Sequence, residues 1–197
     1  MSIAEKLQTI AENEQRVYDA GRQAEYDGFW DAYQENGNRY HWNNAFGNKG
    51  WNEKTYNPKY PINKITYAGN MFQTSQITDT KLALNFSQVS LNACANVFSS
   101  CSALTIVRTL TVAESNTYAG WFTGCKELLT ITFEGTIGES ISFVDSSKLT
   151  NASVQNIIDH LADLTGKTRK TLTLNAQVYV SDTQKAEIEN LNWSLVQ

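Results

Sequence analysis

Residues 96–104 read Asn-Val-Phe-Ser-Ser-Cys-Ser-Ala-Leu, and residues 120–128 read Gly-Trp-Phe-Thr-Gly-Cys-Lys-Glu-Leu. Both stretches have a phenylalanine, a cysteine three residues later and a leucine three residues after the cysteine. Similar copies recur along the chain, with successive phenylalanines 26, 26, 24 and 21 residues apart. Such a period is typical of stacked repeats, in which each copy buries its apolar side against its neighbours. The predicted repeat core consists of Phe46, Phe72, Phe98, Phe122, Phe143, Leu104, Leu128 and Leu149.

Other positions of the repeat have expected roles in the backbone. An asparagine or glycine stands two residues before four of the phenylalanines, and it suits a turn with left-handed backbone geometry. These residues are Asn44, Asn70, Asn96 and Gly120. The cysteine position fits a tight inner corner, where a free thiol behaves as a small apolar group. Alternating apolar residues follow Leu104 and Leu128, and they predict short strands that stack in parallel from copy to copy.

The motifs Phe98–Leu104 and Phe122–Leu128, each followed by a predicted strand, resemble the repeat of BspA-like leucine-rich-repeat proteins. The resemblance covers roughly residues 40–150. It implies a short solenoid, and a function in surface adhesion and protein contact rather than catalysis. Similar repeats occur in tail-associated proteins of bacterial viruses, and the helical N-terminus and compact C-terminal end of this chain resemble those versions.

The regions on either side of the repeats differ from them in period. We expect an N-terminal helix at residues 1–36, a leucine-rich-repeat-like solenoid at residues 37–150 and a small mixed cap at residues 151–197. Ser2 and Glu5 form a capping box at the start of the helix, and Asn36-Gly37 is expected to end it. The predicted architecture is therefore α+β.

The C-terminal cap is expected to contain two helices and two strands. The first helix opens at Asn151, runs through Leu164 and is closed by Gly166. A strand at residues 171–174, a helix capped by Ser181 and a strand at residues 193–195 follow. Such a unit covers the open end of a solenoid.

The N-terminal helix has an aliphatic stripe formed by Ile3, Leu7, Ile10 and Val17. One hypothesis is that the aromatic second half of the helix docks on the first repeat while this stripe pairs with other copies of the chain, as in a coiled coil. The alternative is that the whole helix packs on its own solenoid. We therefore expect either a homo-oligomer held by the aliphatic stripe or a helix that packs on its own solenoid.

Charge and composition argue against several kinds of partner. The formal net charge is -4 and no cluster of lysine and arginine is present, so we expect no nucleic-acid binding. No apolar run is long enough to span a bilayer, and no secretory signal precedes the helix, so we expect synthesis in a cytoplasm without membrane insertion. The three cysteines lack the spacing of a zinc site or a disulfide framework, and we expect no metal and no cofactor.

Catalytic residues are not predicted. The chain has two histidines, His41 and His160, and neither has a sequence partner that would make it a base. The segment from residue 39 to residue 61 is rich in aromatic and polar side chains, which suit contact with a protein or a glycan. Within it, Tyr40, His41, Tyr56 and Tyr60 are the candidate contact residues, whereas Trp42, Phe46 and Trp51 are expected to fill the core.

The resemblance favours a non-catalytic structural or host-contact protein of a bacterial virus, tail-associated and present in the virion. The alternative is an adhesin module of a bacterial cell surface. A glycan-cleaving enzyme is the third class, kept because aromatic surfaces suit sugars. The expected partner in the first two cases is a protein or a cell-surface glycan.

Overall fold

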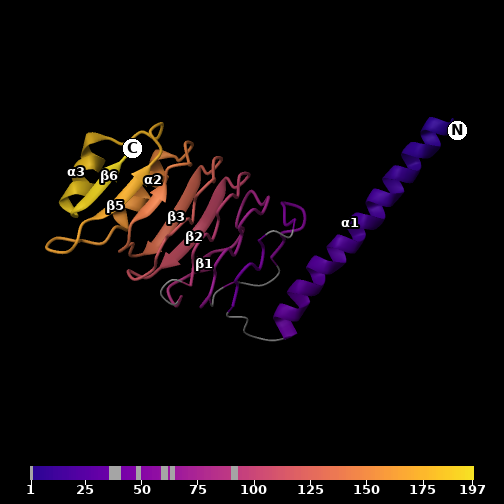
Figure 1. Ribbon diagram of the computed structural model, residues 1–197, viewed down its shortest axis with the longest axis horizontal. Coiled ribbons are helices and arrows are strands. Elements are labelled where there is room, and N and C mark those ends of the chain that lie inside the picture. The colour runs from indigo at the N-terminus through magenta and orange to yellow at the C-terminus, as the bar shows by residue number, and fades with distance from the viewer. Residues whose placement is uncertain (1, 36–40, 48–49, 59–61, 63–64, 90–92) are drawn as a thin grey trace. The chain divides into compact units, whose positions relative to one another are not determined.

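The computed structural model describes residues 2–35, 41–47, 50–58, 62, 65–89 and 93–197 (Figure 1). The chain divides into two compact units, Met1–Asn38 and Arg39–Gln197, which are described separately. The elements are α1 (Ile3–Glu35), β1 (Leu84–Asn85), β2 (Ile106–Val112), β3 (Thr130–Gly135), β4 (Ile141–Phe143), α2 (Asn151–Asp159), β5 (Lys170–Leu174), α3 (Asp182–Asn190) and β6 (Trp193–Val196). The predicted α+β class is confirmed.

The described residues of the first unit form one long helix, α1. The predicted capping box is present at its start: the Glu5 amide donates to the Ser2 Oγ at 3.2 Å, and the Ser2 amide donates to the Glu5 Oε2 at 2.5 Å. These two bonds satisfy amide groups that a helix N-terminus leaves without a helical partner. The expected end of the helix at Asn36-Gly37 lies outside the described residues.

In the second unit, successive turns of chain are joined by regular backbone hydrogen bonds. The amides of Asn70, Phe72 and Thr74 donate to the carbonyls of Ala95, Val97 and Ser99 at 2.9, 2.8 and 2.9 Å. The amides of Asn96, Phe98 and Ser100 donate in the same way to the carbonyls of Ala119, Trp121 and Thr123 at 2.8, 3.1 and 2.6 Å. Each turn therefore holds the next one in a fixed register.

The left-handed turns predicted before the phenylalanines are confirmed. Asn44, Asn70, Asn96 and Gly120 have φ values of 54°, 55°, 58° and 69°. At Gly120 the close stacking is an added constraint, because a Cβ atom there would lie 2.0 Å from the Asn96 Oδ1. A second left-handed position, two residues after the phenylalanine, was not predicted; it is occupied by Thr74, Ser100 and Gly124.

The phenylalanines of the repeat stack into one continuous column inside this unit. The ring centroids of Phe46, Phe72, Phe98, Phe122 and Phe143 are separated in turn by 4.8, 5.3, 5.6 and 4.6 Å. Neighbouring rings are within 20° of parallel. All eight residues of the predicted repeat core are buried.

Two parallel three-stranded sheets complete the second unit. The first has the order β1-β2-β3, and its two longer strands follow Leu104 and Leu128 as predicted. The second has the order β4-β5-β6. Helix α2 lies beside β3 at the edge of the first sheet, where the Ser153 Oγ accepts from the Ile131 amide at 3.1 Å and the Asn156 Oδ1 accepts from the Phe133 amide at 2.6 Å. Side chains of α2 thus take the place of a fourth strand.

The predicted C-terminal elements are confirmed except for the length of one helix. Helix α2 begins at Asn151 as expected but ends at Asp159, not near Gly166. Leu161 instead forms a parallel bridge with Ile137, so long-range pairing ends the helix early. Strand β5, the Ser181 cap of α3 and strand β6 lie where they were predicted.

Strand pairing crosses the boundary that was expected after residue 150. Strand β4, which precedes that point, pairs with β5, which follows it. The expected regions 37–150 and 151–197 therefore share one sheet within the second unit.

Candidate functional site

The four predicted contact residues have different outcomes. Tyr40 and Tyr60 lie outside the described residues. His41 is exposed, and its ring lies 4.5 Å from that of Tyr67, a half-exposed residue on the next turn. The prediction for Tyr56 is wrong, because this side chain is fully buried.

Tyr56 is a core residue with a satisfied hydroxyl group. Its ring packs edge-on against Phe46 and Phe72, with centroids 5.2 and 5.6 Å apart. Its hydroxyl donates to the Thr80 carbonyl at 2.8 Å, and burial raises the pKa of Tyr56 far above the ordinary value. Composition alone could not distinguish this role from an exposed one, since tyrosine suits both.

The outer face of the first sheet is a candidate contact surface that the sequence did not indicate. Val107 and Leu110 of β2 point into the core, whereas the intervening Arg108 and Thr109 are exposed or half-buried. The register with β3 shifts between Val107 and Thr109, which is a β-bulge. A bulge re-aims a side chain, and here it leaves Arg108 on the outer face.

A shallow hollow of about 410 Å³ lies on this face. Arg108 lines it together with hydroxyl-bearing residues of both strands, Thr109, Thr130 and Thr132. Thr109 and Thr132 are register partners on neighbouring strands. We call Arg108, Thr109, Thr130 and Thr132 the threonine face; it carries three hydroxyl groups and a cation.

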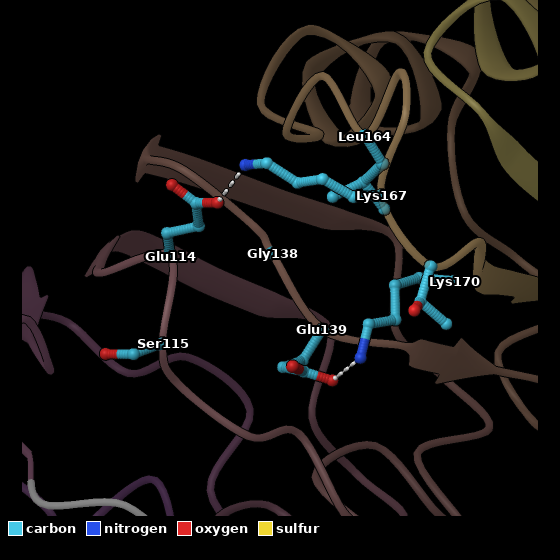
Figure 2. Close-up of a pocket in the computed structure, with 8 residues that line it drawn as sticks. Glu114, Ser115, Gly138, Glu139, Leu164, Lys167 and Lys170 are labelled. Carbon is cyan, nitrogen blue, oxygen red and sulfur yellow. Dashed lines mark hydrogen bonds and ion pairs between the residues drawn. The ribbon is translucent and has the colours of Figure 1, made fainter.

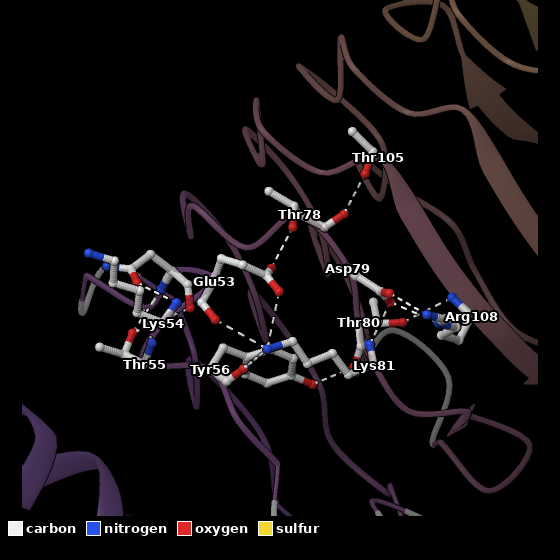
Figure 3. Close-up of polar contacts among 11 residues, drawn as sticks. Glu53, Lys54, Thr55, Tyr56, Thr78, Asp79, Thr80, Lys81, Thr105 and Arg108 are labelled. Atoms are coloured by element: carbon white, nitrogen blue, oxygen red, sulfur yellow. Dashed lines mark hydrogen bonds and ion pairs between the residues drawn. The ribbon is translucent and has the colours of Figure 1, made fainter.

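The guanidinium group of Arg108 is held in place by Asp79 (Figure 3). The Arg108 Nε donates to the Asp79 Oδ1 at 3.0 Å, and the Arg108 Nη2 donates to the Asp79 Oδ2 at 2.5 Å. This hydrogen bonding with Asp79 raises the pKa of Arg108 above its ordinary value. A bidentate pair of this kind orients a guanidinium group and leaves its other N–H groups available.

The neighbouring Lys81 is bonded to a different turn, as Figure 3 also shows. Its Nζ donates to the carbonyls of Glu53 and Tyr56 at 3.2 and 2.7 Å and lies 3.2 Å from the Glu53 Oε1. The three hydrogens of the ammonium group therefore have three acceptors. A hydrogen bond from the Thr78 hydroxyl is the main cause of the lowered pKa of Glu53, and Lys81 adds to it. Lys81 therefore connects two neighbouring turns and does not present a free cation.

A second hollow, of about 590 Å³, lies where loops from both sheets meet (Figure 2). Two ion pairs cross it: Lys167 with Glu114 at 3.3 Å and Lys170 with Glu139 at 2.6 Å. Both lysines are thereby neutralised by carboxylates, and exposed pairs of this kind contribute little free energy. The hollow has no net charge that would select a ligand.

The cysteines are buried free thiols, as predicted. Burial raises the pKa of all three, that of Cys101 to about 11. A raised pKa disfavours the thiolate, which is the nucleophilic form. The Cys101 Sγ donates to the Phe72 carbonyl at 2.9 Å and the Cys125 Sγ to the Phe98 carbonyl at 3.1 Å, so each thiol also ties two turns together.

Within the described ranges, no three His, Cys, Asp or Glu side chains are grouped as metal ligands would be. No described helix has the length and apolar character that crossing a membrane requires. His160 caps the C-terminus of α2, and its Nδ1 lies 2.7 Å from the Asn156 carbonyl oxygen.

The polar partners on these surfaces are far apart in sequence. Asp79 and Arg108 are 29 residues apart, and Glu53 and Lys81 are 28 apart. These separations are close to the length of one repeat. Aligning the repeats with one another is therefore the sequence signal that could have suggested these two ion pairs. The bulge that exposes Arg108 has no such signal.

The sequence matches no protein-family model, and neither a curated protein nor a solved structure matches it.

Proposed function

We propose that the second unit is a BspA-type, leucine-rich-repeat-like solenoid, and that the chain is a non-catalytic structural or host-contact protein of a bacterial virus. In this proposal it is associated with the tail and acts by surface complementarity. The observation that supports the solenoid is the phenylalanine column, whereas the viral role follows from the resemblance of the repeats. Each of the five rings belongs to one copy of the repeat, and two of these copies, at Phe98 and Phe122, contain the full Phe-x-x-Cys-x-x-Leu motif.

The roles of the other motif positions support the same assignment. Cys101 and Cys125 donate to the carbonyls of the phenylalanines one turn earlier, and Leu104 and Leu128 are fully buried. Because the Phe, Cys and Leu positions of the motif all serve to stack one turn on the next, the motif builds a scaffold. Recognition then depends on the side chains that the scaffold leaves outside.

The threonine face is the contact surface that we favour. Arg108 is already oriented by Asp79, so binding through its remaining N–H groups costs little conformational entropy. The neighbouring threonines have short, β-branched side chains on strands β2 and β3, and such side chains have few conformations to lose on binding. Such a surface suits a polar protein segment or a cell-surface glycan.

The proposal is tested by mass spectrometry of purified virus particles from the source. Peptides of this chain are expected in intact particles and in isolated tails. Absence from particles, together with surface exposure on uninfected cells, would support the cell-surface adhesin instead. Recovery in neither place would refute both versions of the contact function.

The contact surface is tested with matched glutamate variants. Thr132→Glu places a charge on the threonine face, whereas Thr123→Glu places the same charge on an exposed turn beside Phe122. We expect the first variant to weaken attachment of the purified protein to host cells at least tenfold, and the second to leave attachment unchanged. Equal binding by both variants would exclude the threonine face.

A further inference from the structure

One edge of the Arg108 guanidinium group is open to a ligand. Asp79 occupies the edge formed by Nε and Nη2, with contacts of 3.0 and 2.5 Å. In the part of the chain that the structure describes, Asp79 is the only partner of this group. The edge between Nη1 and Nη2 therefore keeps a pair of parallel N–H groups, which is the geometry that binds a second carboxylate through both of its oxygens.

Arg108 is held in this position from both ends (Figure 3). Its backbone amide donates to the Thr80 Oγ1 at 2.9 Å. Asp79 is itself fixed, because its Oδ1 also accepts from the Lys81 amide at 2.7 Å. A guanidinium group that is oriented before binding loses little conformational entropy when a ligand arrives, so it suits a specific contact.

The acids that pair with the cations of the hollow lie outside its lining. Arg108 and Lys81 line the hollow. Their partners Asp79 and Glu53 do not, and neither does Glu134 further along β3. The side chain of Arg108 is 53% exposed, whereas that of Asp79 is 15% exposed. A ligand in the hollow therefore meets positive charge first, which favours an anion.

The rest of the lining suits a sugar rather than an extended peptide. Thr109, Thr130 and Thr132 each have a hydroxyl group that can donate and accept, as sugar hydroxyl groups do. A peptide that adds a strand needs free backbone groups. Strand β2 lies between β1 and β3, and side chains of α2 already bond two amides at the outer edge of β3. The volume of about 410 Å³ is within the range of small-ligand sites.

We infer that the hollow on the threonine face binds a carboxylate-bearing sugar, with the carboxylate on the Nη1–Nη2 edge of Arg108. The hydroxyl groups of the sugar bond to the three threonines. This inference rests on the threonine face being the contact surface of the proposed function, and it names the class of ligand that binds there. The contact function does not in turn require an acidic sugar.

The ligand class is tested with immobilised polygalacturonate, hyaluronate and polysialic acid, each beside its carboxyl-reduced, neutral form. The full chain is expected to bind at least one acidic polymer at least tenfold more tightly than the matching neutral form. Binding to none of the three, or equal binding to the neutral forms, would overturn the inference. Tighter binding to poly-L-glutamate than to all three polymers would also overturn it, in favour of an acidic protein segment.

The role of Arg108 is tested with two lysine variants. Arg108→Lys keeps the positive charge but has no planar pair of N–H groups, so it is expected to weaken binding of the acidic polymer at least tenfold. Arg16→Lys makes the same change at an exposed position of α1 and is expected to leave binding unchanged. Equal binding by the two variants would contradict the assignment of the carboxylate to Arg108.

A second variant keeps the test valid if Arg108→Lys lowers the urea denaturation midpoint. Thr132→Val removes one hydroxyl group from an exposed strand position and is expected to weaken binding about fivefold. Unchanged binding by Thr132→Val would contradict the role of the hydroxyl groups.

Failure of this inference and failure of the contact surface give different results. If no acidic polymer binds but Thr132→Glu still weakens attachment to host cells, the threonine face is the contact surface for another kind of ligand. If Thr132→Glu has no effect on attachment, the choice of surface is itself wrong.

Discussion

At the scale of the residue, the cysteine position of the repeat has a more specific role than its size suggests. The sequence predicted a small apolar group in a tight corner, and burial agrees with this. The structure adds direction, because each thiol of Cys101 and Cys125 donates to a phenylalanine carbonyl of the preceding turn. Ser146, which occupies the same position one copy later, donates to the Cys125 carbonyl at 3.0 Å. A small donor is therefore what this position requires.

This requirement predicts different results for two substitutions of Cys125. Cys125→Ser keeps a small donor and should change the free energy of unfolding by less than about 1 kcal/mol. Cys125→Val removes the donor and adds bulk, and should destabilise by about 1–3 kcal/mol. Urea denaturation measures both. Equal stability of the two variants would show that the thiol acts only as a space filler.

The raised thiol pKa values predict a loss of stability in alkali. A thiol whose pKa is raised by folding stabilises the native state fully below its unfolded pKa, near 9, and loses this contribution as pH rises. For Cys101 the loss runs from about pH 9 to pH 11. Denaturation midpoints are expected to fall across this window, and to fall less steeply in Cys101→Ser. A slope unchanged by that substitution would contradict the assignment.

At the scale of the element, the edge of the first sheet depends on two side chains of α2. Ser153→Ala or Asn156→Ala leaves a β3 amide without its acceptor and should cost about 1–3 kcal/mol. Hydrogen exchange should accelerate at Ile131 in the first variant and at Phe133 in the second. Gln155→Ala is the control, since Gln155 bonds toward α3 through Glu187 at 3.0 Å. Uniform acceleration in all three variants would indicate a loosened helix instead.

The elements that local pattern defines were predicted well from the sequence. The Ser2 and Ser181 caps, the strands after Leu104 and Leu128, and the left-handed asparagines all follow from spacing and side-chain chemistry. The prediction that α2 extends to Gly166 was wrong because of a long-range contact. Ile157, Ile158, Leu161 and Leu164 fit a helical period, but the bridge between Leu161 and Ile137 is a long-range contact that no local period contains.

The candidate contact surface was predicted poorly for the same reason. Aromatic composition singled out Tyr56, which is buried, because composition does not report which way a ring points. Arg108 became exposed through a bulge, and its partner Asp79 lies on another turn. Both facts depend on the alignment of neighbouring turns rather than on the residues adjacent in sequence.

At the scale of the whole molecule, the division into two compact units has a measurable consequence. Removing residues 2–35 should leave residues 39–197 with a single cooperative transition at an unchanged denaturation midpoint, since that unit has its own core. Tryptophan fluorescence in urea measures the midpoint, because Trp42, Trp121 and Trp193 are buried in the second unit. A lowered midpoint would show that α1 contributes to the stability of that core.

The regular bonding between turns makes the length of the second unit adjustable. Up to the turn that contains Phe98, each turn offers its successor the same row of backbone amides, a left-handed corner and a flat ring. A duplicated stretch of one whole period would find every contact it needs already in place on both sides. Gene duplication could therefore lengthen or shorten this protein by single turns, and its outer surface could diversify while the interior stayed the same.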